Sequence, residues 1–504
     1  MEILQNITFG FGHALTWSNL LYCAIGCSIG TFIGILPGLG PLATISLLLP
    51  LTYSLPTDAG LIMLAGIYYG AQYGENVSAI TMNIPHSSSI VACIDGYAMT
   101  RKGKAGLALL TAGLSSFIGG TIATAVIAGL APSLARIAFL FSPADYCALI
   151  LLGFVSVSYV SASGGVLSGM GMALVGALLG SIGTDFGTGV QRFTMGQLSL
   201  VDGVTLVSVA LGCFGVAEIT RSLDQRNTFT PFSGKIDMRL SMPNFRRIMP
   251  SALRGSVVGS ILGLLPGGGP VISQFGAYAV EKKLSRYRRE IGQGAIEGVA
   301  GQAAANEAAS RTSFIPLLSI GIPENPTMAL MMAAFIMKGV QPGPLMMTQH
   351  PQTFWGLVAS MWIGNCFLLC LNVPLVKQLL SVLRIPFSVL VPASLLFCCI
   401  GAFSVHNSMD DIFVMAGFGF LGYAFRCLRL DVPPLMLGFI LGPMLEENFR
   451  RATTLSHGSF VVFLERPISA TIIGLLALLI CWKTFRFLRA CLRARELAEQ
   501  EAQC

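Results

Sequence analysis

The sequence predicts an all-α, polytopic membrane protein with two inverted-topology repeats, broken helices and re-entrant hairpins. Three observations lead to this prediction: long apolar runs, a glycine–proline pattern that occurs twice, and basic loops whose distribution reverses between the halves. Hydrophobic residues make up 54% of the 504-residue chain and charged residues 11%, whereas soluble proteins carry about 25% charged residues. The composition is therefore that of a protein solvated by lipid.

Apolar runs recur at 107–134, 144–183, 255–280, 353–376, 388–403 and 467–481. Because a helix needs about 20 apolar residues to cross a bilayer, we expect roughly 11 to 12 spans or half-spans. The 13 cysteines are scattered through these runs without a metal-binding or redox pattern, as expected of small hydrophobic side chains. The N-terminus lacks the basic segment of a cleavable signal, so we expect none.

Two glycine ladders, each followed by a Pro-Gly-x-Gly-Pro segment, match position for position. The first comprises Gly26, Gly30 and Gly34 before Pro37, Gly38, Gly40 and Pro41; the second comprises Gly255, Gly259 and Gly263 before Pro266, Gly267, Gly269 and Pro270. A glycine at every fourth position gives a helix a smooth stripe for close packing. Proline lacks a donor and glycine is permissive, so each ladder helix should break at its Pro-Gly segment.

Charge predicts how the repeats are oriented. Residues 1–100 contain no Lys or Arg, and basic clusters follow at 101–104, 221–254, 282–289 and 483–495. The positive-inside rule places these clusters in the cytoplasm and the N-terminus outside. Matched loops have an opposite charge bias, because 51–57 is uncharged where 281–289 is basic, and 101–104 is basic where 338–352 has one lysine. We therefore predict a first repeat at 1–220, a basic cytoplasmic linker at 221–254, a second repeat at 255–466, and a final transmembrane helix with a cytoplasmic tail at 467–504.

A second pair of breaks is expected at Asn83-Ile84-Pro85 and Gly321-Ile322-Pro323, each followed by hydroxyl or amide residues. A helix that stops inside the membrane leaves unpaired N–H groups that suit a carboxylate and carbonyls that suit Na⁺. The predicted substrate-binding residues are Pro37, Gly38, Gly40, Pro41, Thr44, Asn83, Pro85, Ser87, Pro266, Gly267, Gly269, Pro270, Ser273, Asn306, Pro323, Asn325 and Thr327. The alternative interpretation is that Pro and Gly only kink membrane helices.

Charged residues within apolar segments are expensive and tend to be functional. Glu75, Glu307, Arg311 and Glu324 lie near the expected breaks. Glu75, Asn76 and Glu307 are candidates for ion coupling. Arg311 is a possible charge partner: it either pairs with Glu307 one turn away or contacts a substrate carboxylate. Two interpretations of His86 are open, a proton-sensitive ligand or a residue that faces a loop, and we expect the second.

Catalytic and nucleotide-binding patterns are absent from the sequence. It contains no Walker A segment, no H-E-x-x-H and no G-x-S-x-G, and it has five dispersed histidines. We expect no enzyme, no cofactor beyond a coupling Na⁺ or proton, no metal site apart from an unassigned sodium site, and no nucleic-acid partner. A channel with carbonyl ligands, or a membrane scaffold without flux, remain the alternatives to a transporter.

Several long motifs resemble the TctA family, the large membrane subunit of the tripartite tricarboxylate transporters. These motifs are GTFIGILPGLGPLATISLLLPLTY at 30–53, LAGIYYGAQYGENVSAITMNIP at 64–85, DGYAMTRKGKAG at 95–106, LLPGGGP at 264–270, AYAVEKKLS at 277–285, GQGAIEGVA at 292–300, FIPLLSIGIP at 314–323 and KGVQPGPLM at 338–346. The resemblance implies ion-driven uptake of a small carboxylate across the bacterial inner membrane. It also implies two partners, a small TctB-like membrane subunit and a TctC-like periplasmic binding protein.

The sequence departs from the family pattern at the expected breaks. His86-Ser87 stands where the family usually has Gly-Glu, and Glu324 where it usually has Gly; Ala303 and Glu307 replace an acid and an amide, and Arg311 replaces a small residue. The resemblance therefore implies a carboxylate transporter without specifying citrate. Alternating access with an elevator-like movement is the mechanism that we expect.

Overall fold

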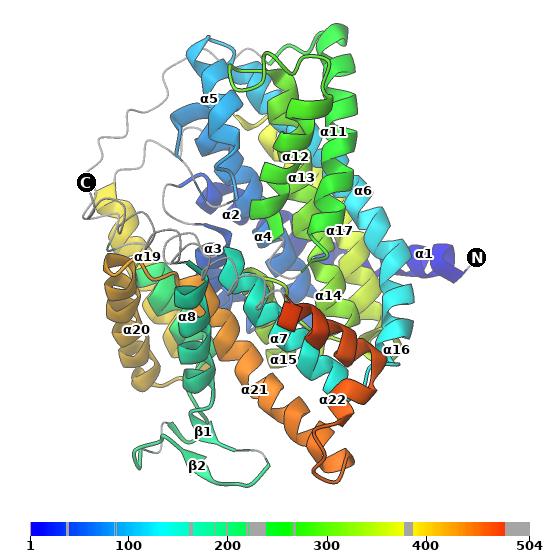
Figure 1. Ribbon diagram of the computed structural model, residues 1–504. Coiled ribbons are helices and arrows are strands. Elements are labelled where there is room, and N and C mark those ends of the chain that lie inside the picture. The colour runs from blue at the N-terminus through cyan, green and yellow to red at the C-terminus, as the bar shows by residue number, and fades with distance from the viewer. Residues whose placement is uncertain are drawn as a thin grey trace, which may run out of the picture.

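The computed structural model is mostly helical (Figure 1). It describes residues 2–36, 40–84, 86, 88–160, 165–185, 187–197, 200–217, 220, 238–265, 269–376, 378 and 387–478. Of the predicted site residues, Pro37, Gly38, Pro85, Ser87, Pro266 and Gly267 lie outside the described residues, as do residues 221–237 of the linker and the C-terminal tail from residue 479.

The first half of the chain gives helices of very different lengths. They are α1 (Glu2–Ala14), α2 (Trp17–Gly34), α3 (Pro41–Leu48), the 3₁₀ turn η1 (Pro50–Thr52), α4 (Thr57–Met82), α5 (Ala92–Arg101), α6 (Ala105–Ala138), α7 (Pro143–Val160), α8 (Gly165–Gly180), α9 (Leu206–Ala210) and the π-helical η3 (Leu211–Val216). The all-α expectation misses one small feature, an antiparallel pair of two-residue strands, β1 (Gly183–Thr184) and β2 (Gln191–Arg192).

The second half also contains helices of very different lengths. Its helices are α11 (Met242–Leu262), α12 (Gly269–Leu284), α13 (Ile296–Thr312), α14 (Phe314–Ser319), α15 (Pro326–Met337), α16 (Met346–Gln349), α17 (Pro351–Asn372), α19 (Phe387–His406), α20 (Met409–Cys427), α21 (Val432–Leu455) and α22 (Val462–Glu465). Among the described helices, α6 and α17 are long and apolar enough to cross a bilayer by themselves. The number of spans stays a prediction.

Both ladder helices end before their Pro-Gly segments. Helix α2 ends at Gly34 and α3 begins at Pro41, while α11 ends at Leu262 and α12 begins at Gly269. A new helix therefore starts at the end of each segment, with Pro41 as the first residue of α3 and Pro270 as the second of α12. Proline in the first helical turn loses no intrahelical hydrogen bond.

The ladders pack in the same way in both halves. A Cβ added at Gly26, Gly30 or Gly34 would lie 2.3 Å from a carbonyl oxygen of α4. A Cβ at Gly255 or Gly259 would lie 2.2 or 2.3 Å from a carbonyl oxygen of α13. Each stripe thus brings two helix backbones together more closely than any side chain permits, as the glycine spacing predicts.

The two halves interlock rather than packing as separate bodies. Helix α6 of the first half packs on α13 and α11 of the second, and α17 of the second packs on α4 and α2 of the first. A second group of helices, α7, α8 and α21, is joined by its own close glycine contacts, such as Gly176 against the Leu435 carbonyl.

The basic and the uncharged loops gather separately. At one end, where α5 and the ends of α11 and α12 lie at the top of Figure 1, Lys102 Nζ donates to the Gln293 carbonyl at 2.5 Å and Arg247 pairs with Glu290 at 2.9 Å. Elsewhere, Lys338 Nζ donates to the carbonyls of Tyr53 and Leu55 at 2.9 and 2.6 Å. Loops that the sequence predicts on one side of the membrane are therefore neighbours in space.

Candidate functional site

The first break folds back on the helix that precedes it. Helix α4 is capped at its C-terminal end by Asn83, which adopts a left-handed conformation (φ 55°), and beyond it Ser88 Oγ donates to Glu75 Oε2. His86 Nδ1 lies 3.6 Å from Glu75 Oε1. Glu75 is fully buried and His86 is 8% exposed. The expected loop-facing position of His86 is therefore wrong, because this turn places the ring beside the carboxylate. We name this group, Asn83, Ile84, His86 and Ser88–Val91, the first tip.

The second break has the same outline. Gly321 adopts a positive φ of 83°, as Asn83 does in the first half. After Pro323, Glu324 Oε1 accepts hydrogen bonds from Ser313 Oγ and from Asn325 Nδ2, the latter at 2.7 Å. Asn325 also caps α15, accepting from the Met328 N–H at 2.9 Å. We name residues Gly321–Asn325 the second tip.

The carboxylate changes place between the tips. When Asn83-Ile84-Pro85 is aligned with Gly321-Ile322-Pro323, Glu75 corresponds to Ser313 and His86 corresponds to Glu324. In the first half the acid, Glu75, lies on α4, and its partners His86 and Ser88 belong to the first tip. In the second half the acid, Glu324, belongs to the second tip, and its hydroxyl partner Ser313 is the C-cap of α13. The sequence-based site did not include Glu324, although this alignment could have found it.

Each Pro-Gly segment ends beside one of these carboxylates. A Cβ at Gly40 would lie 3.2 Å from Glu75 Oε1. A Cβ at Gly269, which has φ +40°, would lie 3.8 Å from both Glu324 Oε1 and Asn325 Nδ2. In both halves the backbone can approach the acid because the residue at this position has no side chain.

The predicted hydroxyls of the first helical turns are both buried. Thr44 Oγ1 donates to the Gly40 carbonyl at 2.9 Å, and Ser273 Oγ donates to the Gly269 carbonyl at 2.7 Å. These matched bonds use the hydroxyl protons, so toward a ligand the oxygens act as acceptors.

Elements of opposite halves meet at the breaks. The Val91 N–H of the first tip donates to Gln274 Oε1 of α12 at 3.1 Å. Helix α15, which follows the second tip, packs against α3, which follows the first Pro-Gly segment. Segments far apart in the sequence thus come together, as the predicted site requires.

Arg311 and Glu307 form an ion pair. Arg311 Nη1 lies 2.5 Å from Glu307 Oε1, and Nη2 donates to Asn365 Oδ1 at 3.0 Å. The guanidinium also lies over the Tyr69 ring, 4.5 Å from its centroid. Both charged side chains are fully buried between α13, α6 and α17. This geometry favours the interpretation that they stabilise the helix packing.

The other predicted residues differ in how they are placed. Asn306 is fully buried, and neither atom of its amide has a hydrogen-bond partner among the described residues. Asn76 donates to the Gln72 carbonyl at 3.3 Å, which leaves its Oδ1 without a described partner. Pro41, Pro270 and Pro323 are buried, Thr327 is partly buried in the first turn of α15, and Asn83 is exposed.

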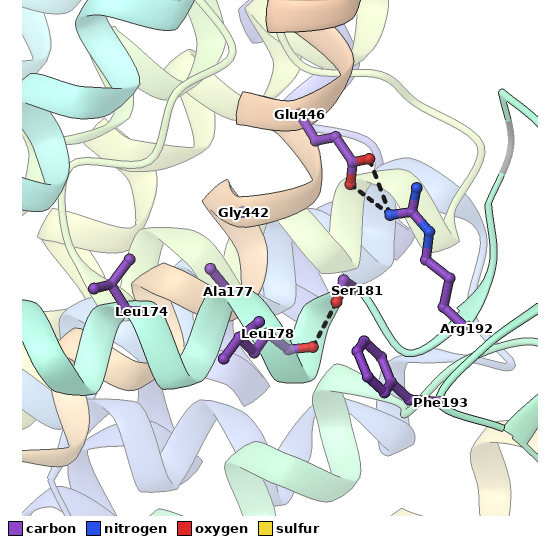
Figure 2. A pocket seen from close by; sticks show the side chains of 8 residues that line it. All are labelled: Leu174, Ala177, Leu178, Ser181, Arg192, Phe193, Gly442 and Glu446. Carbon is purple, nitrogen blue, oxygen red and sulfur yellow. Dashed lines mark hydrogen bonds and ion pairs between the residues drawn. The ribbon is translucent and has the colours of Figure 1, made fainter. Parts of the chain in front are cut away.

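A groove of about 720 Å³ lies elsewhere, between α8, α21 and β2 (Figure 2). Leu174, Ala177, Leu178 and Phe193 form its apolar lining, and Arg192 pairs with Glu446 at 2.9 Å at one end. None of the predicted site residues lines it, so we do not place the substrate there.

Interrupted helices, buried carboxylates and interlocked halves define the chain as a helical membrane protein built for transport. Residues 20–437 match the model of the Tripartite tricarboxylate transporter TctA family, and the chain belongs to that family. It is therefore an integral membrane component of a tripartite tricarboxylate transport system and not an enzyme.

Two relatives come from Agrobacterium vitis. The chain is 48% identical over 476 residues, covering 94% of this chain and 95% of the relative, to an uncharacterized 52.8 kDa protein in the TAR-I ttuC' 3' region. It is 50% identical over 217 residues, covering 43% of this chain and 90% of the relative, to an uncharacterized protein in the TAR-II ttuC' 3' region. No solved structure matches the chain.

Proposed function

We propose that this chain carries a small carboxylate, a tricarboxylate or a related organic acid, across the bacterial inner membrane by ion-driven alternating access. The observation that carries the proposal is that each Pro-Gly segment ends beside a buried carboxylate, with elements of both halves interleaved. The substrate anion would take the free N–H groups at the starts of α3 and α12, together with Thr44, Ser273, Asn306, Asn325 and Thr327.

Inverted topology is the arrangement that the loops support. The loop after α3 meets Lys338, whereas the loop after α12 meets the basic cluster of the first half. Each of these loops thus lies beside the other half's loop of the second matched pair, as expected of repeats with opposite orientation. The positive-inside rule then gives a periplasmic N-terminus and a cytoplasmic C-terminus.

The partners that we propose follow from membership in a tripartite system. A periplasmic TctC-like protein would capture the carboxylate and deliver it, and a small TctB-like membrane subunit would complete the permease. A Na⁺ or proton gradient would drive uptake, with no ATP site in this chain.

Uptake assays test this function. Cells that express the chain with both partner subunits should accumulate labelled citrate, succinate or malate in a saturable and gradient-dependent manner. Conductance without saturation would instead indicate a channel, and no flux of any tested acid would indicate a scaffold.

Glycine variants test the site. Gly40→Val and Gly269→Val should each lower uptake about tenfold or more. The valine at position 40 would contact Glu75, and the valine at position 269 would have to adopt the positive φ of the glycine that it replaces. Gly129→Val is the matched control, since a Cβ at Gly129 has nothing within 4 Å. Membrane insertion should be equal in all three, and full uptake by both site variants would exclude the proposed position.

A further inference from the structure

Most buried carboxylates of the described residues have a charged or backbone partner. Glu281 pairs with Arg254 at 2.7 Å, Glu297 with Arg247 at 2.6 Å and Glu307 with Arg311 at 2.5 Å. Asp95 accepts from the backbone N–H groups of residues 292, 294 and 295, and Asp145 accepts from those of residues 142 and 469. In each case the negative charge is compensated where water is excluded.

Glu75 and Glu324 are different. Both are buried, at 0% and 2% exposure, and neither has a Lys or Arg partner within the described ranges. Their hydrogen-bond donors are Ser88 for the first acid, and Ser313 and Asn325 for the second. One oxygen of each, Glu75 Oε1 and Glu324 Oε2, has no hydrogen-bond partner among the described residues.

Few titratable groups face these two oxygen pairs. His86 of the first tip is nearest to Glu75, with Nδ1 at 3.6 Å from Oε1. Tyr68 of α4 lies close enough to Glu324 to interact with its charge. Neither group supplies a permanent positive charge.

Two uncompensated carboxylates are costly in a membrane interior, and more so when an anion binds next to them. The Coulomb repulsion between like charges a few ångströms apart grows as water is excluded. The proposed site places a substrate carboxylate beside Gly40 and Gly269, and each of these glycines adjoins one of the two acids. Each acid must therefore bind a cation that neutralises its negative charge before the site can enclose the anion.

We propose that Glu75 and Glu324 each bind one proton, so that two protons accompany each carboxylate, and that Glu307 carries none. This inference rests on the proposed function and specifies its coupling. A proton needs only one free carboxylate oxygen, and both acids have one. Glu307 needs no proton because the Arg311 guanidinium already compensates its charge.

The accumulation ratio measures the number of coupled protons. Right-side-out vesicles would contain the chain with both membrane and periplasmic partners, and the probe is whichever of labelled citrate, succinate or malate the wild type accumulates. With the membrane potential clamped at zero, external pH fixed and a gradient of about one pH unit, two protons support about 100-fold accumulation. Glu75→Gln and Glu324→Gln should each reach only about tenfold, and the double variant should not concentrate the probe.

Two controls separate coupling from damage. All three glutamine variants should retain exchange of internal for external substrate, because exchange needs no net proton movement, and Glu75→Asp and Glu324→Asp should keep the wild-type ratio. Glu281→Gln removes a buried carboxylate that is paired with Arg254 and should also leave the ratio unchanged.

Three results would count against the proposal. Wild-type ratios in both single glutamine variants would overturn the assignment of the two acids. Accumulation driven by a Na⁺ gradient without a pH gradient would show that the proton is not the coupling ion. Absence of wild-type uptake of every acid would refute the proposed function itself, which distinguishes that failure from the other two.

Discussion

The glycine ladders allow a prediction whose magnitude follows from the structure. In Gly259→Ala, the new Cβ would lie 2.3 Å from the Ala305 oxygen and 2.7 Å from its Cα. Both are backbone atoms of α13, so no side chain can rotate away. Ordinary carbon contacts begin near 3.5 Å, and α11 and α13 must therefore separate by about 1 Å.

Two opposing terms set the expected stability change. Overpacking of this kind costs about 1–3 kcal/mol, whereas replacing a mid-helix glycine by alanine gains about 1 kcal/mol of helix propensity. Gly129→Ala, in α6, has the gain without the clash, since nothing lies within 4 Å of its Cβ. The helix-propensity gain cancels when the unfolding free energies of the two variants are compared. The remaining difference, about 1–3 kcal/mol, is the cost of overpacking in Gly259→Ala.

Reversible unfolding in mixed micelles measures that difference. Gly129→Ala should unfold at the same or higher denaturant concentration than the wild type, and Gly259→Ala at a lower one. Gly30→Ala should behave like Gly259→Ala, because its Cβ would lie 2.3 Å from the Ile67 oxygen of α4. If both ladder variants unfold like Gly129→Ala, the close backbone contact does not exist.

Two further predictions concern charges. Arg311→Met should destabilise the fold by about 3–5 kcal/mol because it leaves Glu307 buried and unpaired, and adding Glu307→Gln should recover part of that loss in a double-mutant cycle. Hydrogen bonds from Thr188 and from the Gly187 N–H, together with Arg450, hold the pKa of Asp185 well below its usual range. A depressed folded-state pKa contributes stability above the unfolded value of about 3.9 that is lost as the pH falls below it. Wild type should therefore lose more of its thermal stability than Asp185→Asn between about pH 4 and pH 2; equal losses would show that the network does not hold that carboxylate.

Local patterns allowed part of the fold to be predicted. The spacing of Gly26, Gly30 and Gly34 specifies a helix face, and that face makes the predicted close contact. Pro41 and Gly269 mark where new helices begin, because their backbone chemistry acts within one or two residues. Family membership was likewise predicted from motifs and is confirmed over residues 20–437.

Contacts between distant segments could not be predicted in this way. The burial of His86 depends on a left-handed residue, Asn83, that turns the tip back onto α4. The packing of α6 on the second half and of α17 on the first depends on the tertiary arrangement. Hydropathy describes only local composition and does not predict which helices are neighbours. Glu324 was noted as charged but not as part of the site, since its pairing with Ser313 appears only when the second tip has folded.

The packing also locates the breaks between two groups of helices. Helices α2, α4, α6, α11, α13 and α17 form one group, while α7, α8 and α21 form another. Helix α15 contacts α21 of the second group. Helix α3 contacts η3, α19 and α9, and α9 in turn contacts α21. The short helices that follow the breaks therefore lie where the groups meet. The ladders join α2 to α4 and α11 to α13 through backbone contacts, so in a displacement of one group against the other α2 and α11 would move together. Such a movement is what the proposed alternating access requires of a site that both halves share.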